Sequence, residues 1–407
     1  MVQLNTRNVS LLSLFFLLLL FLRRGMQLLY PQIWNEDGPF NMVSFIQHGW
    51  ANLLEPTQGY LVLIPKLITD ISMSISFIYY PEISTYLTWF FTIVLALLVV
   101  YAPTKLRYPF LAATAIFLIP TNAEAFGLPL FTLWFSAILL FLVALWEQGN
   151  RQVLKNILLI FGGLSSPTIV IIIPVQLFRM IVLPRKKEEL ITLGLSIVIS
   201  IIQLSFVMTR GVRDVLHIDL SFIESIVHKF FGYYYLGAFN VGTVLLWLGG
   251  LYLILLIFSY FIRNRRDVYF LILVYLLLAS IALSAARMNP ATLTPIFGGG
   301  ARYFFLPYTL LSWTLIYMMA KSKWYEVAVL PVLILAILTA FQGFCRTHVD
   351  LQWRKHIDLC QKAKGRYPIP IQNDGKADYA WQLVLDAKIC KKYIENDIFT
   401  LPERRDR

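Results

Sequence analysis

Two adjacent acids, Glu36 and Asp37, follow the first apolar segment of the chain in the stretch WNEDGPF. Gly38 allows a tight turn after them, and the flanking Trp34 and Phe40 are suited to a membrane surface. Partial burial of two like charges raises the pKa of at least one carboxyl group, which suits a general base. The pair therefore predicts acid–base chemistry, although two solvated loop carboxylates would have the same sequence.

A late stretch, TPIFGGGARYFFLP, places Arg302 and Tyr303 at the mouth of an apolar segment. The preceding glycines let the backbone approach another group closely. A guanidinium group binds phosphate through paired donors, so Arg302 is a candidate phosphate ligand, with Arg287 in SAARMNP as a second. The alternative is an arginine that only extends toward the membrane interface among aromatic side chains.

Three further stretches contribute polar candidates. In EPTQGYLVLIPK, Gln58 and Tyr60 can offer amide and hydroxyl groups to a polyol and Lys66 can offer charge; the alternative is an ordinary turn before a helix. Glu124 in TNAEAFG can contact an acceptor or a metal, or it is a simple loop acid. The histidines are isolated and no paired Cys or His spacing is present, so we expect no cofactor, and no divalent metal is indicated.

The composition places these residues in a membrane protein. Of 407 residues, 58% are hydrophobic and only 14% are charged, and the mean hydropathy is +0.67. Several apolar runs reach the roughly 20 residues that a transmembrane helix needs, which predicts an all-α polytopic fold. The net charge of +12 lies in short clusters between these runs, which is typical of cytoplasmic loops rather than of nucleic-acid binding.

The basic clusters predict about eleven transmembrane helices, with the N-terminus inside and the C-terminus outside. In the first outside segment, Phe40–Leu54 and 60–75 are amphipathic and are expected to lie in the membrane interface. The break GGLSSP, with Lys155 before it and Arg185 after it, favours a hairpin of two short helices over one long span. The predicted spans are 9–22, 78–101, 108–120, 128–146, the two arms of 156–183, 190–208, 240–262, 268–286, 303–320 and 325–343.

The residues after the last span form a polar tail, so we divide the chain into a membrane domain, 1–343, and an outside tail, 344–407. All three cysteines, Cys345, Cys360 and Cys390, lie in this tail, which indicates an oxidising compartment. At most one internal disulfide can form, Cys360–Cys390 being our choice; free thiols are the alternative. The stretch RYPIPIQ predicts a short strand within the tail.

Taken together, the early ED pair, the PTQGY turn, the GLSSP break and the late GGARYFF stretch resemble polytopic glycosyltransferases of the GT-C class. The layout is similar to the bacterial and phage serotype-converting glucosyltransferases that modify O-antigen, over about residues 1–345. Many of those enzymes carry Asp-Glu or Asp-x-Asp where this chain has Glu36-Asp37. The resemblance therefore leaves open which acid is the base, although Glu36 matches the first acid by position.

The resemblance implies an inverting transfer of a sugar, such as glucose, from a polyprenyl phosphate to an O-antigen or lipopolysaccharide glycan. Glu36 or Asp37 would be the base, and Arg302, with Arg287 or Lys66, would hold the phosphate. The active site would face the periplasm from the bacterial inner membrane. A flippase and a polyprenyl-phosphate sugar synthase would act in the same pathway. A lipid-linked donor agrees with the absence of a Gly-x-Gly-x-x-Gly or Walker motif after a predicted strand.

Two other functions are compatible with a polytopic chain. A flippase for lipid-linked oligosaccharides needs charged groups along its spans, and here the predicted helix centres are almost free of them. An O-antigen polymerase concentrates arginines in a large late loop, and here the loops after the eighth predicted span are short.

Overall fold

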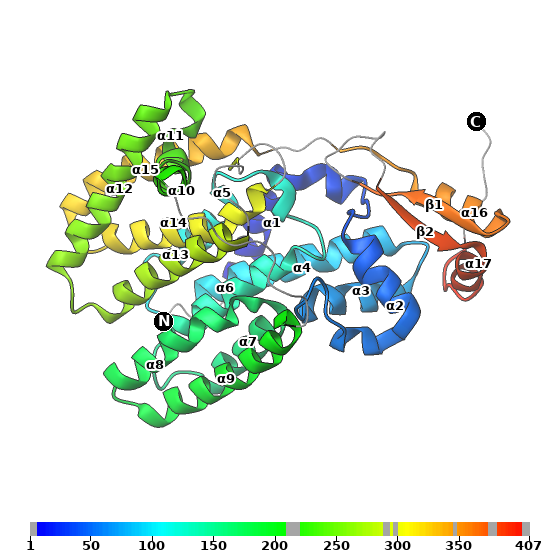
Figure 1. Ribbon diagram of the computed structural model, residues 1–407, viewed down its shortest axis with the longest axis horizontal. Helices are drawn as coiled ribbons and strands as arrows, with labels where there is room; N and C mark the ends of the chain where they lie inside the picture. Colours follow the sequence, from blue (N-terminus) through cyan, green and yellow to red (C-terminus); the bar gives the residue numbers. More distant parts are fainter. Residues whose placement is uncertain are drawn as a thin grey trace.

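The computed structural model of the chain is a helical bundle with a small mixed tail at one end (Figure 1). It describes residues 6–208, 220–287, 294–295, 300–344, 348–372 and 381–400. The helices are α1 (Thr6–Leu29), α2 (Val43–His48), α3 (Leu63–Ile75), α4 (Tyr80–Tyr101), α5 (Pro109–Leu118), α6 (Thr132–Ala144), α7 (Gln152–Ser165), α8 (Ile172–Val182), α9 (Lys186–Met208), α10 (Leu220–Ser225), α11 (Tyr233–Leu236), α12 (Thr243–Arg263), α13 (Val268–Arg287), α14 (Phe305–Met319), α15 (Lys323–Gln342), α16 (Trp353–Lys362) and α17 (Ala387–Glu395). The strands are β1 (Arg366–Pro370) and β2 (Gln382–Asp386), and the short helical turns used below are η1 (Asp37–Met42), η4 (Pro167–Ile171) and η8 (Ala301–Phe304).

Within the described ranges, six helices are long and apolar enough to cross a membrane, so this is a membrane-embedded, mainly helical protein. They are α1, α4, α9, α12, α13 and α15. The predicted count of eleven is not confirmed, because α5, α6, α7, α8 and α14 have only 10 to 15 residues. At 1.5 Å per residue, none of these five spans a hydrocarbon core of about 30 Å by itself.

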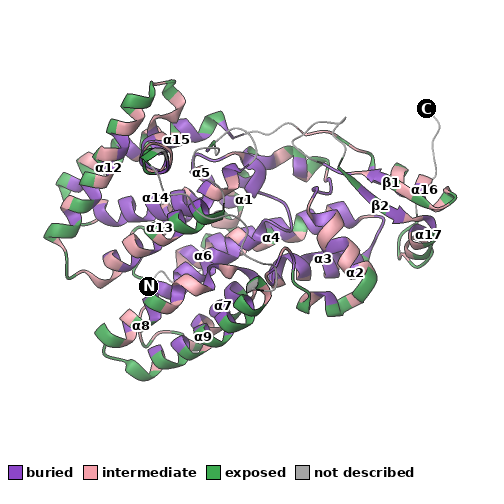
Figure 2. Cartoon of the chain, in the orientation of Figure 1, coloured by how far each residue is buried: buried purple, intermediate pink, exposed green. Residues whose placement is uncertain are grey.

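Two of the short helices, α6 and α14, form the centre of the bundle (Figure 2). All but one of the thirteen residues of α6 and nearly all of α14 are buried. Helices that are apolar on every side are buried in a protein core or lie in lipid, and these two are enclosed by protein. Exposed apolar side chains instead lie on the outer faces of α9, α12 and α15.

The mid-chain hairpin is present. Helix α7 ends at Ser165, Ser166 is extended, and Pro167 opens η4, which leads into α8. Lys155 in the first turn of α7 and Arg179 in the last turn of α8 both contact the Glu189 carboxylate, at 3.3 and 2.7 Å. The first arm therefore begins, and the second arm ends, beside the start of α9, as the flanking positive charges predicted.

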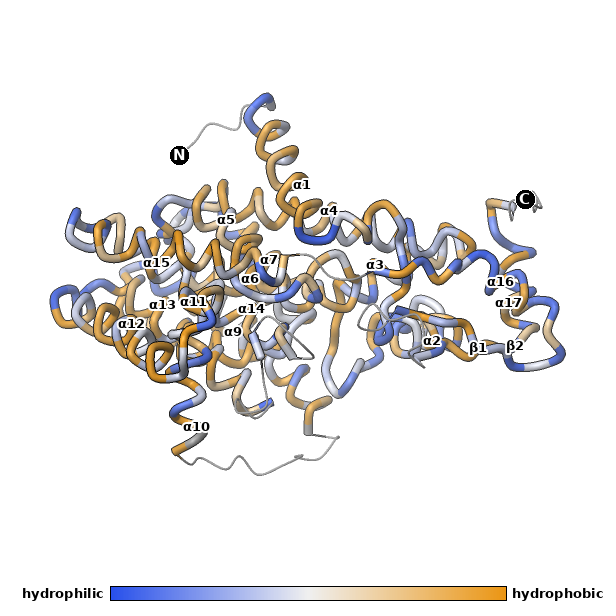
Figure 3. Tube along the Cα trace, turned by 90° about the horizontal axis from the view of Figure 1, so that it is seen from above, coloured by the Kyte–Doolittle hydropathy of each residue, from blue (hydrophilic) through white to orange (hydrophobic). Residues whose placement is uncertain are grey.

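The tail folds against the first loop. Strands β1 and β2 pair antiparallel, which confirms the predicted strand, and a disulfide joins Cys360 on α16 to Cys390 on α17. Cys345 lies outside the described residues. The buried side chains of the tail share one hydrophobic cluster with those of residues 33–45 and 73–80, so the tail does not stand apart from the first loop. Seen from above, the tail extends from the hydrophobic bundle as a more polar end (Figure 3).

Candidate functional site

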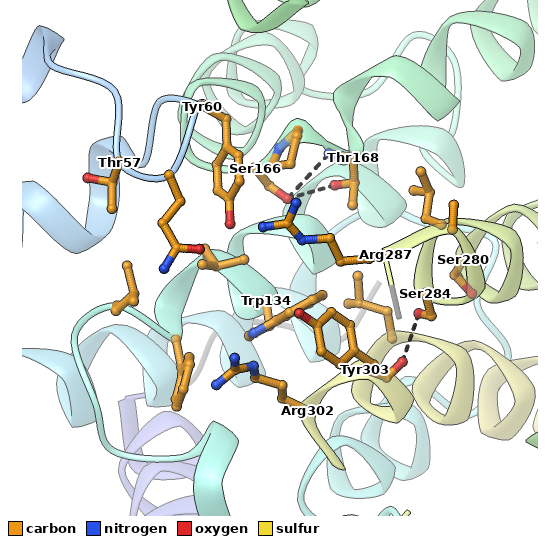
Figure 4. Close-up of a pocket in the computed structure, with 18 of the residues that line it drawn as sticks. Thr57, Tyr60, Trp134, Ser166, Thr168, Ser280, Ser284, Arg287, Arg302 and Tyr303 are labelled. Carbon is orange, nitrogen blue, oxygen red and sulfur yellow. Dashed lines mark hydrogen bonds between the residues drawn. The ribbon is translucent and has the colours of Figure 1, made fainter. Parts of the chain in front are cut away.

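Most of the predicted candidates line one cavity of about 330 Å³. Its wall brings together six separate parts of the chain: the segment 36–60, the start of α6, the α7–η4 turn, the end of α9, the end of α13, and η8 with the start of α14. Figure 4 shows Arg287 and Arg302 entering it from different sides, with Tyr60, Trp134 and Tyr303 around them. Six of the nine predicted residues line it, namely Glu36, Gln58, Tyr60, Arg287, Arg302 and Tyr303.

Glu36 is held by the tail on one side and by Arg302 on the other. Backbone hydrogen bonds from Asn35 N–H to the Gln372 carbonyl (2.9 Å) and from Gln372 N–H to the Ile33 carbonyl (2.8 Å) fix the strand-like segment before it. Its carboxylate lies 3.5 Å from the Arg302 guanidinium and also accepts a hydrogen bond from the Gln58 side chain. Burial raises the pKa of Glu36 above its ordinary value, and Arg302 works against this rise.

Arg302 lies between two acids. Its guanidinium donates to Glu124 at 2.9 Å and approaches Glu36 at 3.5 Å. Burial alone would lower the pKa of Arg302, but the charges of Glu36 and Glu124 more than offset it, so the pKa is raised and the side chain stays charged. Glu124 does not line the cavity; it reaches Arg302 from the loop before α6. Two carboxylates therefore already neutralise this guanidinium.

Two turns set the positions of these side chains. Thr57 and Tyr60 exchange backbone hydrogen bonds across Gln58 and Gly59, whose φ angles of 53° and 91° make a tight reversal that aims Gln58 and Tyr60 at the cavity. Gly300, at φ 100°, opens η8 just before Arg302, a conformation that glycine adopts without strain.

Arg287 differs from Arg302. It lines the cavity from the last turn of α13, yet no ion pair or hydrogen bond is formed by its guanidinium among the described residues. Its charge acts on the Tyr60 hydroxyl, whose pKa burial raises and Arg287 lowers. Arg287 is therefore the cation in this cavity whose charge is available to a ligand.

Asp37 does not line the cavity. One carboxylate oxygen accepts hydrogen bonds from Leu130 N–H (2.8 Å) and from the Asn41 amide (3.4 Å), and the side chain is buried. Burial raises the pKa of Asp37 to about 8, so the group is mostly neutral at pH 7. These contacts suit a structural role for Asp37, which connects η1 to the segment before α6. They do not suit a base that accepts a proton from a ligand.

Lys66, predicted as a phosphate ligand, lies outside the cavity. Its ammonium group donates to the backbone and side-chain oxygens of Asn52, both at 2.8 Å, and to the carbonyl of Glu55 at 2.5 Å. An ammonium group has three donors, and these contacts use all of them. Burial lowers the pKa of Lys66 to about 8. We therefore leave Lys66 out of the site and assign it to bracing the loop 52–55.

Several lining residues were not predicted. Trp134 packs edge-on against Tyr303 with ring centroids 5.8 Å apart, and its indole N–H has no acceptor among the described residues. Ser166 and Thr168 hydrogen-bond to each other at 2.9 Å on the wall near Arg287. Ser166 lies in the GLSSP break and Thr168 follows it, so this break was the sequence feature that pointed to them. Nothing in the sequence around Trp134 separates it from the other apolar residues of α6.

The buried Asp37 predicts a specific pH dependence of stability. The folded chain holds this proton up to about pH 8, whereas the unfolded chain releases it near its ordinary value of 3.8. The protonated Asp37 therefore contributes fully to the stability of the folded chain below about pH 3.8, and this contribution is lost as the pH rises through about 8. Melting temperatures measured from about pH 5 to 8 should therefore fall more for the wild type than for Asp37→Asn. Glu395→Gln, at an exposed position, should follow the wild type; parallel curves for all three proteins would contradict a buried proton on Asp37.

In the described part of the chain, no group of three His, Cys, Asp or Glu side chains is arranged to hold a metal ion. Comparisons with known proteins found no matching family model, no matching curated protein and no matching solved structure.

Proposed function

We propose that this protein is an inverting glycosyltransferase of the GT-C type. It would move a hexose from a polyprenyl phosphate to an O-antigen or lipopolysaccharide glycan at the periplasmic face of the bacterial inner membrane. The observation that carries the proposal is the mixed lining of the cavity. An acid and two guanidinium groups line it, and so do apolar side chains that are exposed on candidate membrane spans.

The apolar part of the lining suits a lipid chain. Val207 on α9 and Leu283 on α13 line the cavity, and each is 41% exposed on the outer face of a candidate membrane span. A ligand in this cavity can therefore leave an apolar chain among lipids while its polar head lies near Glu36 and Arg287. A sugar joined to a polyprenyl phosphate has this form.

Glu36 is the proposed base, because it alone of the two adjacent acids faces the cavity. Its carboxylate would take the proton from an acceptor hydroxyl as that oxygen forms a bond to the anomeric carbon. The bond from the anomeric carbon to the phosphate oxygen would break with its electron pair left on the polyprenyl phosphate. Attack from the face opposite the phosphate inverts the anomeric centre.

Arg287 is the proposed partner of the departing phosphate, in place of Arg302. Negative charge develops on the phosphate oxygen as the bond breaks, and a cation that no carboxylate neutralises stabilises it best. Such a contact typically contributes about 3 kcal/mol to the transition state. Arg302 would instead position Glu36 and keep it ionised, while Glu124 holds Arg302.

The aromatic wall would bind the sugars. Tyr60, Trp134 and Tyr303 surround the space between the two arginines, and Gln58 adds an amide. Binding sites combine aromatic surfaces with a few convergent polar groups in this way. The unpaired indole N–H of Trp134 is a donor that a sugar hydroxyl could satisfy.

The test is transfer by the purified full-length protein. Polyprenyl-phosphate glucose and other polyprenyl-phosphate hexoses would be offered with lipopolysaccharide, and both the mass gain of the acceptor and the release of polyprenyl phosphate would be followed. We expect transfer with inversion from at least one such donor and none from nucleotide sugars. Movement of a lipid-linked sugar across reconstituted vesicles without any bond transfer would contradict the proposal and favour the flippase.

A further inference from the structure

A second polar hollow lies at the opposite end of the bundle from the cavity. It has a volume of about 760 Å³ and is lined by Arg263, Arg265 and Arg266 from the α12–α13 turn and by Lys321 from the α14–α15 turn. We call these four residues and the space between them the basic hollow. Arg287 and the basic hollow lie at the two ends of α13, whose 20 residues correspond to about 30 Å. The basic hollow is therefore at the other membrane boundary.

The charges of the basic hollow are mostly uncompensated. No ion pair of Arg265, Arg266 or Lys321 is found among the described residues, and all three side chains are exposed. Asp267 is the one acid among the described residues of the wall, and its two carboxylate oxygens already lie 2.8 and 3.1 Å from the Tyr317 hydroxyl that donates to them. Glu326, on the first turn of α15, is exposed and does not line the basic hollow. The excess of fixed positive charge favours an anionic ligand.

Lipid-facing side chains adjoin the basic hollow. Phe258 and Ile262, one helical turn apart on α12, are 53% and 57% exposed. Trp324 is 55% exposed and lies 5.6 Å from the Arg263 guanidinium, a pairing typical of the interface between headgroups and acyl chains. A ligand whose anionic head fills the basic hollow would thus have an apolar surface on which to lay its chains.

We propose that the basic hollow binds the headgroup of an anionic phospholipid, with the acyl chains against Phe258 and Ile262. Basic pockets between transmembrane helices are known to select such headgroups. The competing explanation is that these residues only orient the chain in the membrane, as clusters of positive charge do in any cytoplasmic loop. The two explanations differ in whether position matters, because orientation depends on charge count and a binding site depends on where the charges lie.

The experiment compares two variants with the same loss of charge at the same end of the bundle. Arg265→Gln with Arg266→Gln removes two cations from the basic hollow. Lys186→Gln with Lys187→Gln removes two exposed cations at the start of α9, outside it. Each purified full-length protein would be titrated with phosphatidylglycerol or phosphatidylcholine and bound lipid counted by native mass spectrometry. Glycerol 3-phosphate would be the competitor without acyl chains.

We expect the wild type to prefer phosphatidylglycerol. The arginine variant should bind it about thirtyfold more weakly, since it lacks two cations and each cation near an anionic lipid contributes about 1 kcal/mol. The lysine variant should retain wild-type affinity, and all three proteins should bind phosphatidylcholine alike. Equal weakening in both variants would overturn the proposal in favour of diffuse surface charge. Full competition by glycerol 3-phosphate would overturn it in favour of a site for free phosphates. Neither result depends on sugar transfer.

Discussion

Glutamine in place of Glu36 is expected to lower the rate of sugar transfer by about 10³-fold, the usual contribution of a positioned base. Glutamine keeps the shape of the side chain but cannot accept the acceptor's proton. Arg302 would keep its contact with Glu124, so the site should stay folded. Single-turnover transfer, with melting temperature as the check on folding, measures the effect. In the wild type the rate should rise with pH as Glu36 loses its proton, at a pH above the ordinary range for glutamate because burial raises its pKa.

The neighbouring acid supplies a matched control. Asp37→Asn changes the same chemical group one residue along, at a side chain that is buried and mostly neutral. Its oxygen can still accept from Leu130 N–H, so transfer should fall by less than tenfold. A larger loss in Asp37→Asn than in Glu36→Gln would reverse the assignment of the base.

Removing the guanidinium of Arg287 should give the second large effect, a loss of about 10²- to 10³-fold in kcat. The expectation rests on its position in the cavity and on the absence of an ion pair to it among the described residues. Arg287→Lys should recover part of the rate, since a point charge remains but the paired donors do not. The measurement is kcat and KM for polyprenyl-phosphate glucose under saturating acceptor.

Arg302→Lys and Arg302→Ala are the comparison, because they should act through Glu36. Arg302→Ala removes the charge that opposes the raised pKa of Glu36, so the rise of rate with pH should move to higher pH. Arg302→Lys keeps a positive charge and should move it less. Arg287→Ala should leave that pH dependence in place. If the two alanine variants lower kcat equally and neither moves the pH profile, the separate roles given to the two arginines are wrong.

Much of the helical arrangement could be predicted from the sequence, because the length of an apolar run and the charges that flank it are local properties. The GGLSSP break with Lys155 before it and basic residues after it predicted the hairpin, and Glu189 is the group that both arms reach. The placement of Glu36 near Arg302 was also open to prediction, because both were expected at the mouths of spans on one side.

Other features depend on contacts that no local pattern records. The prediction of Lys66 as a phosphate ligand was wrong, because three protein oxygens already accept its hydrogen bonds. The neutralisation of Arg302 depends on Glu124, which is 178 positions away along the chain. The residues of α6 and α14 were predicted as transmembrane helices, since an apolar helix enclosed by other helices has the same composition as one in lipid.

The contact between the tail and the first loop also constrains how the chain threads the bilayer. Leu351 N–H binds the side chain of Gln32, 319 positions away, so the chain leaves α1 and α15 on the same face. The number of crossings between these two points must then be even. After α1, the candidate spans α4, α9, α12, α13 and α15 are five, which is odd. The two arms of the hairpin return to their starting face. If all five of these candidates cross the membrane, one or all three of α5, α6 and α14, together with the residues that flank them, also carry the chain from one face to the other.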